Sequence, residues 1–306
     1  MAPQIKKLLW LVAIMILIIG AGTYYYSLFL THPPGTGPVQ ISMSEAKIST
    51  DTNEIWIIGL GDSVTAGFGA SAGKSYWDLL VNNAQEEDLS LGGKCLKRIY
   101  PNLISTNLSK SGSTSLQHER QQIPRLPRDA QRKAIIVITT GGNDLIHSYG
   151  KEPPKEGAMY GATLDQAKPW IQNFGVRLDK MVREINTHFP KGAEIYMATI
   201  YDPSDGTGVM RHTGLPEWLD GVKILAEYNK LILNLNKNHP NVRVVEMHQA
   251  FLGHGLHARH WWEPYYDPAD PFCWLASNIE DPNDRGYDAI QRLMWNAIAT
   301  RIVRSP

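Results

Sequence analysis

The chain has 306 residues, of which 43% are hydrophobic and 20% are charged, a composition typical of a globular protein with a sizeable core. Thirty Lys and Arg residues balance thirty Asp and Glu residues, so the formal net charge is zero. Without an excess of positive charge, the protein is not expected to bind nucleic acid or to be drawn to an anionic surface.

A hydrophobic segment lies near the N-terminus. Residues 8–30 carry no charged side chain and, as a helix, would be about 35 Å long, enough to cross a bilayer. Lys6 and Lys7 precede it, so we expect residues 1–7 to stay in the cytoplasm and the remainder to be exported. We therefore predict an uncleaved, single-pass signal anchor with an extracytoplasmic domain. The alternative is a signal peptide cleaved near residues 20–22, which would release a secreted or periplasmic protein.

Residues 31–53 begin with a Pro- and Gly-rich stretch and continue with polar residues, so we predict a linker. Residues 54–306 alternate apolar runs typical of buried strands with amphipathic helical patterns. We expect strands at 55–58, 102–108, 134–140, 193–200 and 242–247, and helices at 76–81, 170–188, 219–236 and 284–303. This alternation predicts one α/β domain with a mainly parallel central sheet covered by helices on both faces.

Short turns of small and polar residues follow three of these strands, at 61–63, 111–115 and 141–144. The carboxyl ends of parallel strands share one edge of the sheet, where open α/β sheets place their ligand sites. Ser63 is a candidate nucleophile there, and the backbone N–H groups of Ser63 and Gly112 with the side-chain amide of Asn143 are candidate donors to an oxyanion. Each residue alone is explained as well by a helix cap or a turn. Their common position after three strands favours the catalytic interpretation.

These blocks, G-D-S at 61–63, the glycine at 112 and G-G-N-D at 141–144, resemble those of the SGNH (GDSL-type) serine hydrolases. The resemblance spans about residues 55–303 and implies a three-layer, flavodoxin-like α/β fold. It implies Ser63 as the nucleophile and Ser63, Gly112 and Asn143 as the oxyanion hole. The family consists of esterases, lipases and acylhydrolases without cofactors, so the expected substrate is an ester: a lipid, an O-acylated glycan or a small ester.

The last block departs from the family pattern. The family carries its acid and base in D-x-x-H-P before the final helix, whereas Asn278 and Asp281 occupy these positions here. A serine without a base is a poor nucleophile. Our hypothesis is that a histidine of the preceding loop, His254 with its flexible glycine neighbours or otherwise His257, reaches Ser63 while Asp281 orients it. The alternative is a non-catalytic SGNH-fold binding or scaffold protein of the cell envelope that has lost its base.

The two cysteines, Cys95 and Cys273, would either form a disulfide in an exported domain or remain free thiols. We predict no metal site, because no Cys/His cluster has zinc spacing. A metal site at His254, His257 and Asp267 has only the weak support of loop spacing. Aromatic residues between 261 and 274 are interpreted either as packing of a long loop or as a wall for an acyl chain or sugar ring.

Overall fold

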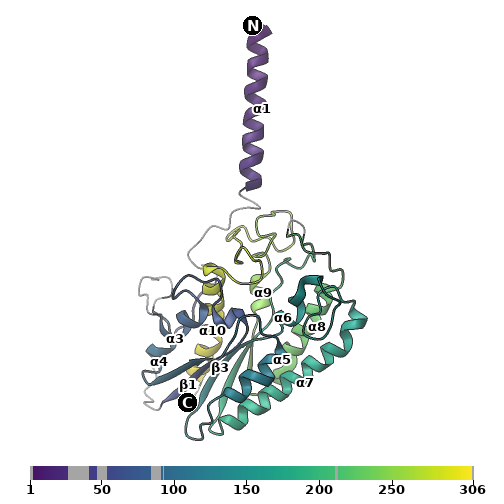
Figure 1. The fold of residues 1–306 in the computed structure, drawn as a ribbon. Coiled ribbons are helices and arrows are strands. Elements are labelled where there is room, and N and C mark those ends of the chain that lie inside the picture. The colour runs from purple at the N-terminus through teal and green to yellow at the C-terminus, as the bar shows by residue number, and fades with distance from the viewer. Residues whose placement is uncertain are drawn as a thin grey trace.

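The computed structural model of the chain describes residues 3–26, 41–46, 54–83, 91, 93–210 and 213–304. Helix α1 (Pro3–Tyr25) projects away from an α/β domain (Figure 1). None of its residues is buried, and its mean hydropathy of 2.1 makes it a candidate membrane span. Its length and composition fit either an anchor or a signal peptide. It covers most of the predicted span, of which residues 27–30 lie outside the described residues.

A five-stranded sheet of order β2-β1-β3-β4-β5 organises the domain. The strands are β1 (Ile55–Gly61), β2 (Leu103–Asn107), β3 (Ala134–Thr139), β4 (Ala193–Ala198) and β5 (Val242–Val245). All neighbouring strands are parallel. The register pairs Gly59 with Asn107 and Gly61 with Thr139, so β1, β2 and β3 end side by side. The predicted sheet edge with three adjoining turns is therefore present.

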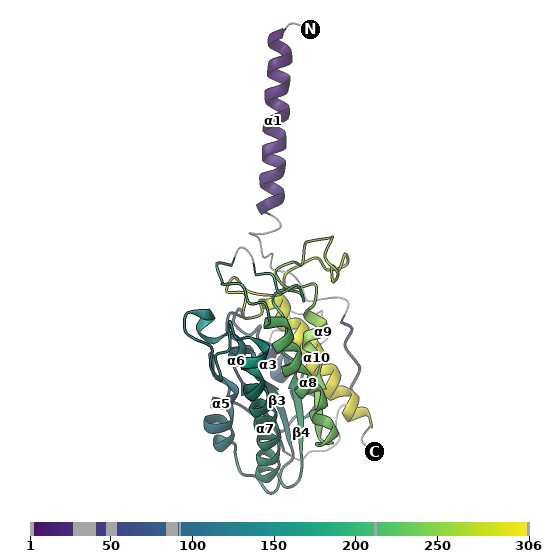
Figure 2. The same cartoon turned by 90° about the vertical axis from the view of Figure 1, so that its right-hand side faces the viewer.

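Helices cover both faces of the sheet, which gives the domain three layers (Figure 2). One layer contains α7 (Leu164–His188) and α8 (Gly221–Asn234), and the other contains α3 (Tyr76–Asn82), α4 (Leu96–Ile99), α9 (Met247–Phe251) and α10 (Asp284–Arg304). Successive strand residues point to opposite layers: Ile58 packs with the α7 and α8 cluster, and Ile57 packs with the α3 and α10 cluster. The predicted α/β fold class is confirmed.

Short helical segments lie in the connections. They are α2 (Ser63–Ala66), α5 (Ser115–Gln117), η3 (His118–Gln122), η4 (Ile123–Arg125), α6 (Gly142–Ile146), η5 (His147–Gly150) and η6 (Leu235–Lys237). Two of them, α2 and α6, begin directly behind β1 and β3. They therefore carry two of the predicted site residues, Ser63 and Asn143, at the carboxyl edge of the sheet.

The predicted helices and strands are present with shifted ends. The largest shift is that α7 begins at Leu164 rather than at residue 170. A capping box explains it: the Thr163 hydroxyl accepts from the Gln166 N–H at 3.2 Å, and the Gln166 side chain accepts from the Thr163 N–H at 2.9 Å. The strongest apolar periodicity marks only the later part of the helix, whereas the cap sets its start.

Part of the predicted linker packs on the domain. The side chain of Asn296 accepts from the Ser44 N–H at 2.7 Å, and the Trp295 indole donates to the Ser44 carbonyl at 2.8 Å. The Arg292 side chain donates to the Ile41 carbonyl at 3.2 Å. Residues 41–46 therefore run along α10 in the same direction as the helix. Residues 31–40 and 47–53 lie outside the described residues.

Both cysteines are buried free thiols, so of the two alternatives the structure contains the unpaired one. Cys95 lies just before α4, and Cys273 lies in the long loop before α10. In the part of the chain that the structure describes, no group of three or more His, Cys, Asp or Glu side chains is arranged to hold a metal ion.

Candidate active site

Ser63 is the first residue of α2, on a tight turn behind β1. Gly61 has a φ of +131°, and a Cβ there would lie 2.2 Å from the Thr139 carbonyl oxygen, so the turn requires glycine. Asp62 caps the helix: its Oδ1 accepts from the Val64 N–H at 3.1 Å and from the Thr139 hydroxyl at 2.7 Å. The N–H of Ser63 lies in the first helical turn, where no intrahelical acceptor exists. Ser63 thus presents both a hydroxyl and a donor to the pocket that it lines.

Side-chain hydrogen bonds join the three turns into one unit. The Gln122 amide pairs with the backbone of Gly61 in both directions, at 2.8 and 2.7 Å. The Ser113 hydroxyl donates to the Gly61 carbonyl at 3.0 Å. The Asn143 amide in turn donates to the Ser113 carbonyl at 3.1 Å. The turn after β2 is therefore held against the turns after β1 and β3.

The two further candidate oxyanion donors lie on these turns. Gly112 has a φ of +77°, in the left-handed region that favours glycine, and a Cβ there would meet no atom within 4 Å. The backbone at this point is therefore open to a ligand. Asn143 lines the same pocket as Ser63. Its amide nitrogen carries two protons, so the bond to Ser113 leaves a second proton for the pocket.

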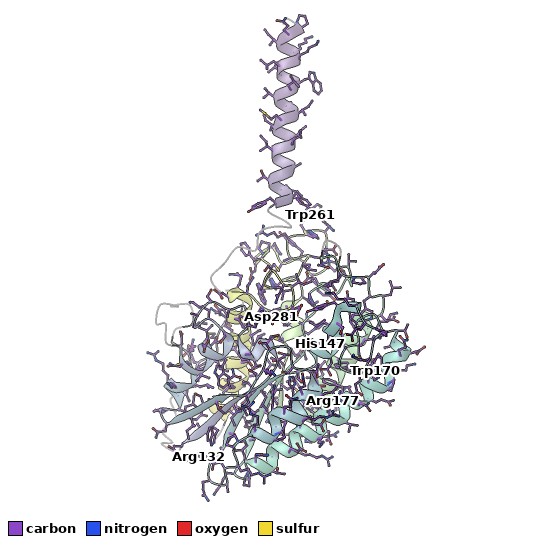
Figure 3. All side chains as sticks on the ribbon, viewed as in Figure 1. Arg132, His147, Trp170, Arg177, Trp261 and Asp281 are labelled. Carbon is purple, nitrogen blue, oxygen red and sulfur yellow. The ribbon has the colours of Figure 1, made fainter. Side chains whose placement is uncertain are left out.

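Asp144, the last residue of G-G-N-D, makes contacts that stabilise the fold. Its buried carboxylate accepts from the N–H and the hydroxyl of Ser115, at 2.7 and 2.5 Å. Arg177 of α7, which is labelled in Figure 3, lies 3.7 Å from this carboxylate and 2.7 Å from that of Glu156. Asp144 thus binds the second turn to the third.

Asp281 is an ionisable residue whose carboxyl group lies near the Ser63 hydroxyl. Burial raises the pKa of this carboxyl group above its usual value, and the nearby Ser63 hydroxyl lowers it by less. The Asn278 amide donates to Oδ2 at 2.7 Å. Oδ1 is buried and accepts no hydrogen bond from the residues that the structure describes. Asp281 (Figure 3) therefore has an oxygen with unused capacity to accept a proton.

Two more carboxyl groups lie near Asp281. The pKa of Asp62 is raised to about 7, mainly by burial and to a smaller extent by the charge of Asp281. Burial and the same charge raise the pKa of Glu280, which also lines the pocket, to about 7. The Tyr201 hydroxyl donates to the Glu280 carbonyl oxygen. Asp62 and Glu280 therefore change between their protonated and ionised forms near neutral pH.

His254 is held inside the long loop. Its ring stacks on the indole of Trp274, with 3.7 Å between centroids, and its Nδ1 lies 3.3 Å from the Phe272 carbonyl oxygen. Burial lowers its pKa. Gly253 beside it is required both by its φ of +89° and by close packing, since a Cβ there would lie 1.9 Å from the Tyr265 carbonyl oxygen. His254 is thus fixed by partners other than Ser63.

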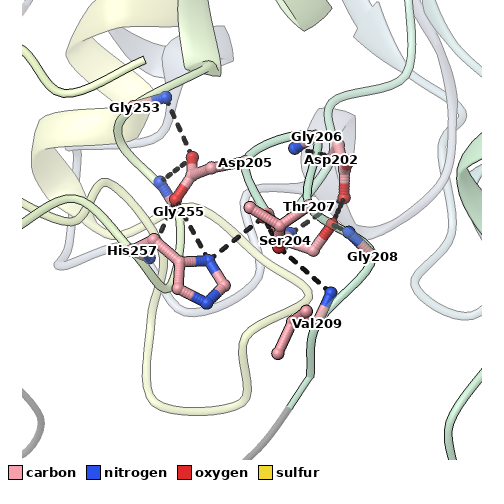
Figure 4. A network of polar contacts seen from close by, with 10 residues as sticks. All are labelled: Asp202, Ser204, Asp205, Gly206, Thr207, Gly208, Val209, Gly253, Gly255 and His257. Carbon is pink, nitrogen blue, oxygen red and sulfur yellow. Dashed lines mark hydrogen bonds and ion pairs between the residues drawn. The ribbon is translucent and has the colours of Figure 1, made fainter. Parts of the chain in front are cut away.

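His257 belongs to a polar network between two loops (Figure 4). Its N–H donates to Oδ2 of Asp205 at 2.8 Å, and its Nδ1 lies 3.1 Å from the Ser204 carbonyl oxygen. Asp205 also accepts from the N–H groups of Gly253 and Gly255. Within the described part of the chain, no histidine lines the pocket that contains Ser63. A histidine base, which stays a prediction, would require this loop to rearrange.

The pocket beside Ser63 has a volume of about 140 Å³. Much of its wall is apolar and comes from three separate segments; it includes Leu145, Ile146, Ile200, Leu215, Trp218 and Leu225. A cavity of about 150 Å³ holds one benzene molecule, so this pocket has room for about six carbon atoms. Sequence reasoning missed the pocket and Glu280, because the lining residues come from segments far apart in the chain that no local pattern connects. The loop aromatics do not line it: Trp274 is buried in packing, and Trp261 is exposed.

Comparisons with known proteins agree with this geometry. A model described as the GDSL-like lipase/acylhydrolase family matches residues 60–289, which include Ser63, Gly112, Asn143 and Asp281. The fold is similar to that of an extracellular lipase from Streptomyces rimosus, with 17% identity, a TM-score of 0.54 and coverage of 79% of this chain and 99% of that one. It is also similar to the acetylxylan esterase Axe2 from Geobacillus stearothermophilus, with 18% identity, a TM-score of 0.50 and coverage of 82% and 97%. No curated protein sequence matches the chain.

Proposed function

The chain belongs to the GDSL-like lipase/acylhydrolase family, and from that premise we propose that it hydrolyses carboxylic esters through an acyl-enzyme on Ser63. One observation carries the proposal. The Ser63 hydroxyl lies beside the carboxyl group of Asp281, at the wall of an apolar pocket that Asn143 also lines. A nucleophile, a proton acceptor and an oxyanion donor thus meet at one place.

Acylation begins with the base. As the Ser63 oxygen attacks the ester carbonyl carbon, its proton passes to the Asp281 carboxylate. Burial raises the pKa of Asp281, which makes it a better base than an exposed aspartate. The oxyanion of the tetrahedral intermediate accepts hydrogen bonds from the N–H groups of Ser63 and Gly112 and from the Asn143 amide.

Deacylation restores the enzyme. When the intermediate collapses, protonated Asp281 gives its proton to the departing alkoxide, and an alcohol leaves the acylated Ser63. A water molecule then gives a proton to Asp281 and attacks the acyl carbon. The second intermediate collapses, Ser63 recovers its proton from Asp281, and the carboxylic acid leaves.

The pocket favours an aliphatic acyl group over an acetyl group. Each buried methylene contributes roughly 0.8 kcal/mol to binding, and an acetyl group would leave most of the 140 Å³ unused. We therefore propose that the substrate is an ester of a medium-length acyl chain, which fits a lipid better than an O-acetylated glycan.

A fluorophosphonate probe tests the nucleophile on the full purified chain. We expect the probe to label the wild type and not Ser63→Ala, and we expect only the wild type to cleave nitrophenyl hexanoate, faster than the acetate. Ser71→Ala, which changes an exposed serine nearby, is the matched control and should behave as the wild type. If the wild type neither reacts nor cleaves, the non-catalytic binding or scaffold function is favoured, as the histidines held elsewhere would suggest.

We also propose that α1 stays attached as a membrane anchor, with the hydrolase domain outside the cytoplasm. The support is a span without charged residues behind Lys6 and Lys7. The protein should fractionate with membranes and resist alkaline carbonate extraction. A soluble protein with a mature N-terminus near residue 23 would instead identify α1 as a signal peptide.

A further inference from the structure

The large apolar side chains that the domain exposes are concentrated at one end. Of eight such residues in its described part, Val176 lies on α7 and Leu233 on α8. The other six lie on loops at the carboxyl ends of the strands, and we name them the apolar rim: Phe68, Val209, Leu219, Trp261, Trp262 and Tyr265. Clustered exposed apolar residues mark a binding surface, whereas scattered ones do not.

The apolar rim borders the pocket. The N–H of Phe68 donates to the Ser63 carbonyl at 3.0 Å. Leu219, which is 82% exposed, follows the pocket residue Trp218, and Val209 precedes the pocket residue Met210. Whatever covers these three rim residues therefore also lies beside the site.

The described segment 41–46 and helix α1 both point to this same end of the domain. α10 starts there, because Asp284 accepts from the Ser71 N–H at 2.8 Å and Tyr287 donates to the Phe68 carbonyl at 2.7 Å. The Ile41 carbonyl is bound by Arg292, eight residues along α10 and thus about 12 Å from its start. Since residues 41–46 run parallel to α10, residue 41 is the end of this segment that lies nearer the apolar rim. Figures 1 and 2 agree, because α1 projects from that end in both views.

We infer that the apolar rim rests in the interface of the bilayer that α1 spans, so that the pocket opens toward lipid. This rests on the proposed anchor and deepens the proposed function, since a lipid ester would then enter the site from the membrane. Three of the six rim residues, Trp261, Trp262 and Tyr265, are of the two types enriched at membrane interfaces. Trp261 lies beneath α1 in Figure 3.

The test uses the full chain in phosphatidylcholine vesicles that contain lipids spin-labelled near the headgroup. An environment-sensitive fluorophore is attached at the rim position through Trp262→Cys. The matched control carries it at Leu233→Cys, at the end of α8 that lies away from the apolar rim. The native cysteines are buried and should not react. We expect blue-shifted and quenched emission at position 262, and aqueous, unquenched emission at position 233.

The same emission at both positions would overturn the inference. So would a blue shift at position 262 without quenching by the spin-labelled lipids, because it would indicate contact with another protein rather than with the bilayer. Activity supplies the second measurement. Trp261→Ser with Trp262→Ser should lower the turnover of a bilayer ester about tenfold, a change of about 1.4 kcal/mol, and leave a soluble short ester unaffected. Ser63→Ala should keep the quenching pattern, so failure of the membrane contact and failure of the catalytic proposal give different results.

Discussion

The chain builds the two halves of the candidate site in different ways. The turn half, with Ser63, Gly112 and Asn143, lies within a few residues of the ends of β1, β2 and β3. The loop half, with Asp281, lies near the end of the more than thirty residues that separate α9 from α10. Strand register places the turn half directly. The loop half depends on contacts between distant residues, such as the buried ion pair of Arg285 with Asp270 at 2.7 Å.

The backbone of the loop half does not depend on the side chain at position 281. The Ala276 N–H donates to the Asp281 carbonyl at 2.8 Å, and the Asn283 N–H donates to the Trp274 carbonyl at 2.8 Å. Gly286 allows close packing there, since a Cβ would lie 2.3 Å from the Trp274 carbonyl oxygen. These backbone bonds would be kept if the side chain of Asp281 were replaced. In the turn half, two of the three proposed oxyanion donors are backbone N–H groups, which a side-chain substitution does not remove.

Removing the carboxylate of the loop half should have the largest effect. Asp281→Asn should lower turnover by roughly 10²–10⁴-fold, because the general base is lost while the Asn278 contact is kept. His254→Gln and His257→Gln should stay within a few-fold of the wild type. Steady-state kinetics with a nitrophenyl ester, beside circular dichroism to confirm folding, measures this.

The opposite pattern of activity loss would make a histidine the base and Asp281 the residue that orients it. If either histidine variant lost activity as completely as Ser63→Ala, and Asp281→Asn lost less, the loop would supply a histidine base oriented by Asp281. The rate would then rise with pH through a histidine-like pKa near 6.5.

Changing the turn half should cost less than removing the base. Asn143→Ala should lower the turnover number by about 10²–10³-fold, because one oxyanion donor is lost. Its KM should change little. Asn173→Ala, an exposed asparagine on α7, is the control for loss of the amide alone. An unchanged turnover number in Asn143→Ala would remove Asn143 from the oxyanion hole.

The two halves also interact through the charges of Asp62 and Asp281. The pH dependence of the free energy of unfolding measures this interaction. Folding raises the pKa of Asp62 to about 7, so between about pH 4 and 7 the folded state binds more protons and its stability falls as pH rises. Asp62→Asn keeps the cap and removes the charge. It should raise the free energy of unfolding by roughly 4 kcal/mol at pH 8 and by nothing near pH 4.

Urea unfolding of the full chain in detergent at both pH values gives this difference. The gain at pH 8 should shrink in the Asp281→Asn background, because the neighbouring charge contributes to the raised pKa of Asp62. An equal gain at both pH values would show that Asp62 is not held in a protonated form by folding.

The sequence by itself determined the α/β class, the parallel sheet and the three turns that follow its strands. These features are local: an apolar run predicts a buried strand, and a turn that follows it must lie at the sheet edge. For the same reason the positions of Ser63, Gly112 and Asn143 relative to the sheet could be predicted. Element ends were less certain, as α7 shows, because a cap such as Thr163 lies outside the apolar pattern.

The tertiary structure decided which side chain meets Ser63, what the pocket is made of and where the apolar rim lies. His254 and His257 come within a few residues of each other in a loop whose path depends on partners such as Trp274 and Asp205. The pocket and the rim combine segments far apart in the chain, so no spacing in the sequence predicts them. Residues that meet only through long-range packing leave no local pattern, and the loop half of this site consists of such residues.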